Sequence, residues 1–153
     1  MQDVSGTGLS LTVIASGTYP SGFICKAFAD DSDPLDFPEL QITEYGMGLN
    51  GDLVVWSAPK PLEVSISVIP GTDEENYLDF LFEANRVAKG KRSNKDVITF
   101  IANYPDGTRK VLAPGRITKG LPGNSVASGG RIKTKKYSFV FENKVYIHFT
   151  FLL

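Results

Sequence analysis

The sequence predicts a mainly β protein, a β-barrel or sandwich of antiparallel strands with one flanking α-helix at about residues 72–89. Short segments in which apolar and polar residues alternate recur along the chain, as they do in half-buried strands. Fifteen Gly and nine Pro residues supply turns between these segments. One segment has the periodicity and end signals of a helix. Because βαβ alternation is missing, a doubly wound sheet is disfavoured.

Length and composition predict one domain, residues 1–153. The chain is 42% hydrophobic and contains ten Phe and six Tyr residues, which is enough for a packed core. No run approaches the ~18 apolar residues of a membrane-spanning helix. The first residues, MQDVSGTG, lack the basic and apolar regions of a signal peptide. We therefore expect no membrane segment and synthesis in a cytoplasm.

The helix is predicted at Thr72–Gly90, after the stop signal Pro70-Gly71. Thr72 and Glu75 have the spacing of a capping box, in which the hydroxyl accepts a hydrogen bond from the Glu75 amide and the carboxylate bonds the Thr72 amide. Gly90 is a natural residue to follow the helix end. The apolar stripe consists mainly of Leu78, Leu81, Phe82, Asn85 and Ala88. This stripe is expected to pack on the β-core.

Alternating patterns predict strands on both sides of the helix. Before it, Leu9–Ala15 and Gly22–Phe28 form a predicted hairpin, an acidic loop spans Ala29–Pro38, and further strands are Leu40–Tyr45, Leu53–Ser57 and Leu62–Ile69. After it, the turn signal Tyr104–Gly107 separates the predicted strands Val97–Tyr104 and Thr108–Ala113. A separate strand, Arg116–Lys119, is expected beyond Pro114-Gly115. A final hairpin is predicted from Lys135–Glu142 and Lys144–Leu152.

Charge is distributed unevenly along the chain. Residues 1–83 hold two basic and fourteen acidic residues, a net charge of −12, and residues 84–153 hold fourteen basic and three acidic residues, a net charge of +11. This asymmetry fits a nucleic-acid surface, two complementary surfaces that meet within or between copies, or two halves that interleave in space. The basic clusters are Lys89–Lys95 and Arg131–Lys136. They lack the interleaved aromatics of a single-strand binding platform, which argues against nucleic-acid recognition.

Few residues offer catalytic or metal-binding chemistry. Cys25 is the only cysteine and His148 the only histidine, so both are expected to be structural. Gly46–Gly51 matches G-x-G-x-x-G, but a strand-like segment follows where a dinucleotide site needs a helix. A tight crossing between strands is the better interpretation. The acidic run at Asp30–Asp33 lacks the Gly and Glu of an EF-hand loop, which leaves a solvated loop, a partner surface or a casual divalent-ion site. No cofactor, metal site or enzymatic activity is predicted.

Four segments carry a resemblance to a known family: MGLNGDLVVWS, PLEVSISVIPGTDEENYLDFLFEANR, DVITFIANYPDGTRKVL and GLPGNSVASGGRIKTKKYSFVFE. Together they resemble the tail tube proteins of contractile-tailed bacteriophages, which are related in fold to the tube proteins of type VI secretion systems. The resemblance implies hexameric rings that stack into a hollow tube within the virion tail, assembled in the host cytoplasm. The implied partners are further copies of the chain, the sheath protein and the baseplate tube-initiator proteins. DNA would pass through the tube without specific binding.

Stacked rings need head-to-tail contacts between different surfaces, which an acidic and a basic half can supply. The resemblance implies that a long loop in the first half reaches a neighbouring ring, and this loop maps onto Ala29–Pro38 or Gly46–Gly51. The polar face of the helix is also expected to meet a neighbour. The resulting candidate contact residues are Asp30, Asp31, Asp33, Asp36, Met47, Leu49, Asp79, Glu83, Arg92, Lys95, Arg131 and Lys133. The basic clusters are expected to face away from the lumen.

The sequence leaves two alternatives open. One is a tube-initiator, tail-completion or baseplate-proximal protein of the same fold. The other, weaker one is a soluble β-barrel that binds a ligand or acts as an enzyme, although no histidine pair or recognisable nucleophile supports it.

Overall fold

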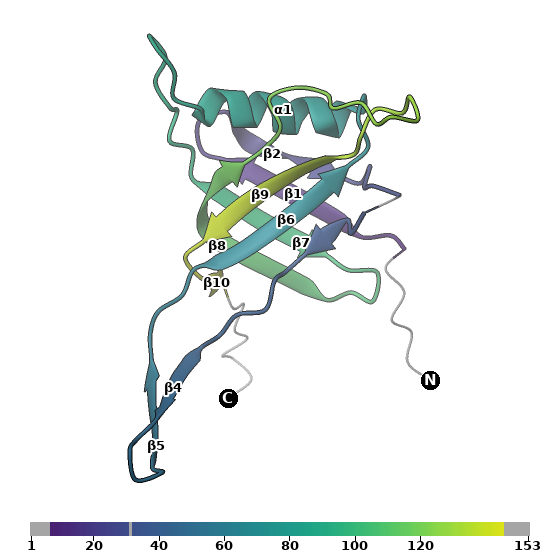
Figure 1. The fold of residues 1–153 in the computed structure, drawn as a ribbon. Helices are drawn as coiled ribbons and strands as arrows, with labels where there is room; N and C mark the ends of the chain where they lie inside the picture. The colour runs from purple at the N-terminus through teal and green to yellow at the C-terminus, as the bar shows by residue number, and fades with distance from the viewer. Residues whose placement is uncertain (1–6, 31, 146–153) are drawn as a thin grey trace, which may run out of the picture.

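The computed structural model describes residues 7–30 and 32–145. Its elements in chain order are β1 (Ser10–Ala15), β2 (Tyr19–Cys25), β3 (Leu35–Asp36), β4 (Thr43–Met47), β5 (Leu53–Ser57), β6 (Leu62–Val68), α1 (Asp73–Asn85), β7 (Ile98–Asn103), β8 (Arg109–Lys119), β9 (Lys135–Phe141) and β10 (Lys144–Val145). The predicted mainly β class with one helix is confirmed. Figure 1 shows α1 across one end of a curved sheet and the β4–β5 hairpin projecting from the other end.

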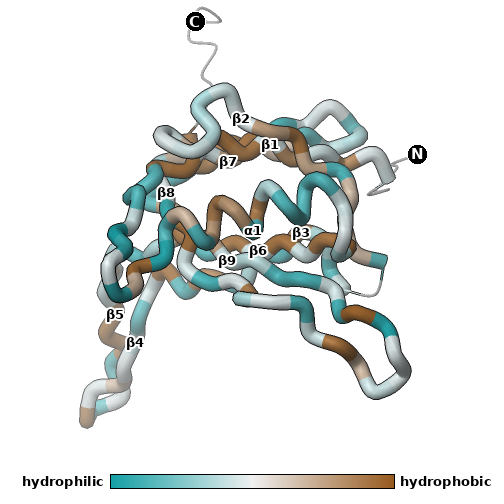
Figure 2. The backbone as a smooth tube through the Cα atoms, turned by 90° about the horizontal axis from the view of Figure 1, so that it is seen from above, coloured by the Kyte–Doolittle hydropathy of each residue, from teal (hydrophilic) through white to brown (hydrophobic). Residues whose placement is uncertain are grey.

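The large sheet has eight antiparallel strands. Their order is β2-β1-β7-β8-β9-β6-β3, with β10 beside β8. Because β2 and β3 are the two ends of this order, the described strands form a curved open sheet and no closed barrel. Viewed from above, β2, β1 and β7 form one wall and β9, β6 and β3 the other, with α1 lying between them (Figure 2).

The core lies between these walls and beneath the helix. Buried and partly buried residues alternate along β1 and β7, as the sequence pattern predicts. The Phe100 ring lies 4.5 Å from that of Phe139 and 4.8 Å from that of Phe141, measured between ring centroids. Leu78 and Leu81 of α1 are completely buried. Full burial of such a side chain stabilises the fold by about 1.5–3 kcal/mol.

The helix begins as predicted and ends earlier. The Thr72 hydroxyl accepts a hydrogen bond from the Glu75 amide at 3.3 Å, as in a capping box. The Glu75 carboxylate, however, pairs with Lys135 at 2.6 Å, so the second half of the predicted capping box is replaced by an ion pair. The prediction of a helix as far as residue 89 is wrong, because the backbone is already extended at Arg86.

Buried polar contacts explain the early end of α1. The Asn85 side chain donates a hydrogen bond to the Asp96 carboxylate and accepts one from the Asp96 amide, both at 2.9 Å. A continuing helix would carry Asp96 away from Asn85, so the chain leaves the helix after Asn85. Val87 is exposed, and no core contact draws the helix further. Gly90 instead takes a positive φ of 72° in a turn closed by hydrogen bonds between Ala88 and Lys91.

Three predictions for the first half of the chain, two strands and one loop, need correction. β2 starts at Tyr19 and ends at Cys25, about three residues earlier at each end than predicted. Its early start follows from the short preceding turn, which the Asp96 carboxylate closes by accepting hydrogen bonds from the amides of Gly17 and Thr18. The loop Ala29–Pro38 contains the short strand β3, which pairs with β6. The strand predicted at Leu40–Tyr45 lies at Thr43–Met47.

The C-terminal part also differs from its prediction. β8 runs unbroken through Pro114, although two strands were expected there. Its first half pairs with β7 and β10 and its second half with β9. Where β8 changes partners, a Cβ on Gly115 would collide with the Phe141 ring, which explains the glycine. The predicted final hairpin is wrong in its described part, because β10 pairs with β8. His148 and the rest of that prediction lie outside the described residues.

Candidate subunit interface: the β4–β5 arm

The strands β4 and β5 form a hairpin, called here the arm (Thr43–Ser57), that belongs to a sheet of its own. At its tip, the Gly48 amide donates to the Asp52 carbonyl at 2.7 Å, and the Gly51 amide donates to the Gly48 carbonyl at 2.9 Å. Gly51 has a φ of +86°, which glycine adopts readily. The G-x-G-x-x-G run is therefore a hairpin turn, as its interpretation as a crossing between strands predicts.

Apolar side chains cover both faces of the arm. Opposed residues share a face in an antiparallel pair, so Tyr45 lies beside Val55 and Met47 beside Leu53. Tyr45 is 70% exposed and Met47 69% exposed. The other exposed large apolar residues of the arm are Leu49, Leu53, Val54, Val55 and Trp56. Brown segments along β5 and at the tip in Figure 2 show the same hydropathy.

Little within the chain stabilises this arrangement. A lone two-stranded hairpin is only marginally stable in water. The root carries an ion pair of Lys60 with Glu44 at 3.3 Å, but both side chains are about one-third exposed, and such pairs contribute ~0–1 kcal/mol. A contiguous apolar surface on a projecting element is typical of a site that contacts another protein. The arm is therefore the strongest candidate interface among the described residues.

A groove of about 500 Å³ lies at the root of the arm. Its walls come from the segments that flank the arm and from the β7–β8 hairpin and β10. The lining residues are Phe37, Pro38, Glu39, Leu40, Lys60, Pro61, Leu62, Glu63, Tyr104, Lys110, Leu112 and Lys144. Seven of them are apolar or aromatic, and five are charged. The groove can receive an apolar group that has a polar or acidic edge.

The acidic residues predicted as contacts lie in several places. Asp30 pairs with Arg131 at 2.8 Å, and the hydrogen bond from this guanidinium lowers the pKa of the Asp30 carboxyl. Asp33 and Asp36 line a second hollow together with Lys136. Asp31 lies outside the described residues. The structure thus joins Asp30 and Arg131, which belong to opposite charge halves, within one subunit.

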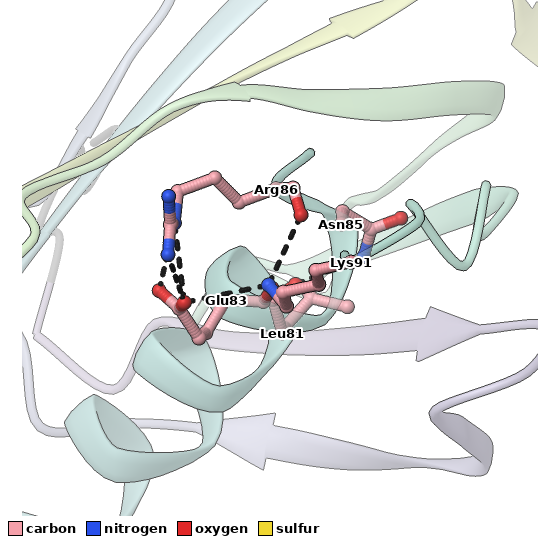
Figure 3. Close-up of polar contacts among 5 residues, drawn as sticks. All are labelled: Leu81, Glu83, Asn85, Arg86 and Lys91. Carbon is pink, nitrogen blue, oxygen red and sulfur yellow. Dashed lines mark hydrogen bonds and ion pairs between the residues drawn. The ribbon is translucent and has the colours of Figure 1, made fainter. Parts of the chain in front are cut away.

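The end of α1 holds the predicted contact Glu83 (Figure 3). Its carboxylate lies 2.6 Å from the Arg86 guanidinium and 3.3 Å from the Lys91 ammonium. The Arg86 hydrogen bond, followed by that of Lys91, lowers the pKa of Glu83 to about 2. The Lys91 ammonium also donates to the carbonyl oxygens of Glu83 and Arg86 at the end of the helix, where carbonyls lack the amide partners of a continuing helix.

The second basic cluster divides between the surface and the interior. Arg131 and Lys133 are exposed, but Lys135 is buried, with its ammonium 2.6 Å from Glu75 and 3.7 Å from Asp79. In the first cluster, Arg92 and Lys95 are exposed. Burial, followed by the carboxylates of Asp79 and Glu75, raises the pKa of the adjacent Tyr137 hydroxyl.

The two charge halves also interleave in the sheet. The basic-half strands β7, β8 and β9 lie between the acidic-half strands β1 and β6. Residues of the two halves also form ion pairs within the chain: Asp30–Arg131, Glu75–Lys135 and Glu83–Lys91. The strand order and these pairs place acidic and basic residues of opposite halves next to one another in a single subunit. The subunit contacts expected of the predicted acidic and basic residues stay predictions.

The contacts predicted from the sequence include Met47 and Leu49 of the arm but none of its other exposed apolar residues. The signal was present in Leu53–Trp56, where four consecutive apolar residues must place apolar side chains on both faces of a strand. A strand with apolar side chains on both faces is normally covered on both sides, either by its own chain or by another protein.

The described residues contain no cluster of three or more metal-ligating side chains. Within the same part of the chain, no helix has the length and apolar character needed to cross a bilayer.

The fold and the exposed arm define a class of protein, a mainly β chain with an apolar hairpin that projects from its large sheet. The family described as tail fiber protein gp32 matches residues 2–145, so the chain belongs to this family. This membership makes the protein phage-tail-like. The resemblance seen in the sequence is confirmed to that extent, and the more specific assignment to tail tube proteins stays a prediction. No curated protein matches the chain.

Two solved structures share the fold. A chain of the anti-feeding prophage (AFP) baseplate, a 6-fold symmetrised cryo-EM structure, has a TM-score of 0.54 and 10% identity, with 95% of each chain covered. A chain of the PVC sheath/tube terminator in its extended state, from an extracellular contractile injection system, has a TM-score of 0.50 and 14% identity. That comparison covers 95% of this chain and 96% of the other. At such identities the likeness concerns the fold alone.

Proposed function

We propose that the protein is a structural subunit of a contractile tail, and that residues 1–153 form one tail-tube-like domain that assembles as homohexameric rings stacked along the tube. The observation that carries the proposal is the apolar arm, which projects from the sheet and exposes both faces. Water contact with this surface is unfavourable, so association that covers it lowers the free energy. Membership of a phage-tail-like family supports a location in the tail of a particle.

In this assembly the arm of one subunit contacts a neighbouring copy through a different surface of that copy. Such heterologous contacts close into a ring or continue along an axis. Exposed charges, among them Asp33, Arg92, Lys95 and Lys133, set the orientation of the contacts more than their strength. Sheath and baseplate tube-initiator proteins are the further partners. DNA passes through the ring without specific binding, and the subunits assemble in the host cytoplasm.

A second candidate places the protein at one end of the tube, as an initiator, a terminator or a baseplate-proximal ring. The similarity to chains of a baseplate and of a sheath/tube terminator favours this candidate. The same arm would then join one ring to the end of the tube.

Sedimentation velocity of the purified chain tests the self-assembly. We expect the mass to rise from the monomer to a hexamer or larger species as the protein concentration increases. A monomer at every concentration and salt concentration would contradict both ring proposals.

Immunogold labelling of intact particles separates the two positions. Label along the whole tail supports the stacked-ring position, and label confined to one end of the tube supports the second candidate. Label on fibres alone would contradict both.

A further inference from the structure

We propose that the groove at the root of the arm receives the arm tip of a second copy of this chain. The inference rests on the proposed self-assembly and names the surface that each arm contacts. The tip comprises residues 47–53, in which Met47, Leu49 and Leu53 are all more than half exposed. The groove therefore has an occupant of defined chemistry, a short apolar hairpin turn.

The groove suits an apolar turn in size and lining. Its volume of about 500 Å³ falls in the range of ~300–1,000 Å³ that is usual for pockets that bind ligands. Phe37 is 44% exposed and Leu40 42% exposed, so apolar surface is available at its wall. The buried residue Leu112 is also part of its lining. Docking of the tip would remove apolar surface of both partners from water at once.

Charge supports the same pairing. Asp52 is the only charged residue of the tip, and it is exposed. Three lysines line the groove, against the two acids Glu39 and Glu63. Lys60 is already paired with Glu44 of its own arm, so Lys110 and Lys144 are the cations placed to meet Asp52. Both of these lysines are exposed.

The arm cannot fill the groove of its own chain. Each arm strand has five residues, so at ~3.4 Å per residue the tip lies about 17 Å from the root. The contact must therefore be intermolecular. Because the tip and the groove are different surfaces, every subunit offers one of each, and the contact repeats around a ring or along a filament.

Disulfide trapping tests this contact directly. The only native cysteine, Cys25, is completely buried, so introduced thiols are the accessible ones. The variant Leu49→Cys/Leu40→Cys places one thiol at the tip and one at the groove. After mild oxidation we expect a ladder of covalent dimers, trimers and larger species on a non-reducing gel. Both side chains are exposed, so the fold should be unchanged.

Three matched controls make the result interpretable. Leu49→Cys/Val126→Cys carries its second thiol at an exposed apolar position away from the groove lining, and Leu49→Cys and Leu40→Cys alone each lack one partner. None of the three should form the ladder. A ladder from the Val126 control, or dimers from Leu49→Cys alone at the level of the double variant, would overturn the groove assignment.

A charge exchange provides independent evidence. We expect Asp52→Lys and Lys110→Glu each to weaken association several-fold, and the double variant to recover most of the loss. If the association of the double variant is weakened by the sum of the two single effects, the pairing of Asp52 with Lys110 is contradicted. If the wild-type chain is monomeric, the proposed function itself fails. If it assembles but gives no tip–groove ladder, only this assignment fails.

Discussion

Asp96 connects two parts of the molecule that are distant in sequence. Its carboxylate accepts hydrogen bonds from the Gly17 amide at 2.8 Å, the Thr18 amide at 3.1 Å and the Asn85 side chain at 2.9 Å, and the Thr18 hydroxyl also donates to it. The side chain thus fixes the β1–β2 turn against the end of α1. Burial raises the pKa of Asp96, but these hydrogen bonds outweigh burial and lower the pKa below its usual value.

Replacing Asp96 with Asn tests the network. An amide cannot accept all four hydrogen bonds, so we expect a loss of about 1–3 kcal/mol in the free energy of unfolding at neutral pH. The pKa of Asp96 is lower in the folded state than in the unfolded state, where it is ~3.9. Ionised Asp96 therefore stabilises the folded state fully above pH ~3.9, and this stabilisation is lost as the pH falls through the folded pKa. Urea unfolding at a series of pH values should show the difference between wild type and variant shrinking below about pH 4. A constant difference would contradict the assignment.

Lys135 provides a second residue-scale test. Its ammonium and the Glu75 carboxylate are both buried, 2.6 Å apart. Lys135→Met leaves this carboxylate buried without its partner, and we expect a loss of about 3–5 kcal/mol in unfolding free energy. Lys135→Met/Glu75→Leu should recover most of the loss, because a buried pair is often replaceable by apolar side chains. Urea unfolding measures both, and a double variant no more stable than the single one would contradict this account.

These contacts mark the limit of prediction from the sequence at the residue scale. The Thr72 cap was predictable because its partner lies three residues away. The partner of Glu75 was not, because Lys135 follows much later in a run of basic residues that suggests surface. The same limit applies to Asp96, whose acceptor role depends on a turn far along the chain.

At the scale of elements, local patterns identified most strands and left their arrangement undetermined. Alternation located β6 and β7 almost to the residue, since each has one face in the core. It could not show that β10 pairs with β8, because pairing depends on residues distant in sequence. It also could not show that β4 and β5 form a sheet of their own, although the apolar run in β5 indicated an unusual strand.

The arm should be important for assembly and unimportant for the fold. Leu49→Asp changes a fully exposed tip residue, so we expect the free energy of unfolding to stay within about 0.5 kcal/mol of wild type. Association should weaken at least ~10-fold, because a charge would enter an apolar contact. Urea unfolding and sedimentation velocity measure the two effects. Val126→Asp, also exposed, is the control and should change neither. Equal association of both variants and wild type would exclude the arm as the interface.

At the scale of the whole molecule, the charge asymmetry of the sequence is partly cancelled by the fold. Acidic-half and basic-half strands are neighbours in one sheet, and several opposite charges pair within the chain. The interface candidate is mainly apolar, with Asp52 as the one charge of its tip. Burial of apolar surface should therefore dominate the free energy of association.

Salt dependence distinguishes an apolar contact from a charged one. Between about 0.1 M and 1 M salt the Debye length falls from ~10 Å to ~3 Å, which screens exposed pairs and leaves apolar burial in place. We expect the association constant to fall less than ~10-fold over this range. Sedimentation velocity at each salt concentration measures it. A much steeper loss would mean that the acidic and basic halves meet mainly between subunits.

Negative-stain electron microscopy of the purified wild-type chain beside Leu49→Asp shows directly whether the arm is needed for assembly. We expect rings or hollow filaments for wild type and single small particles for Leu49→Asp under the same conditions. Single particles for wild type at every concentration, or identical rings from both proteins, would contradict this expectation.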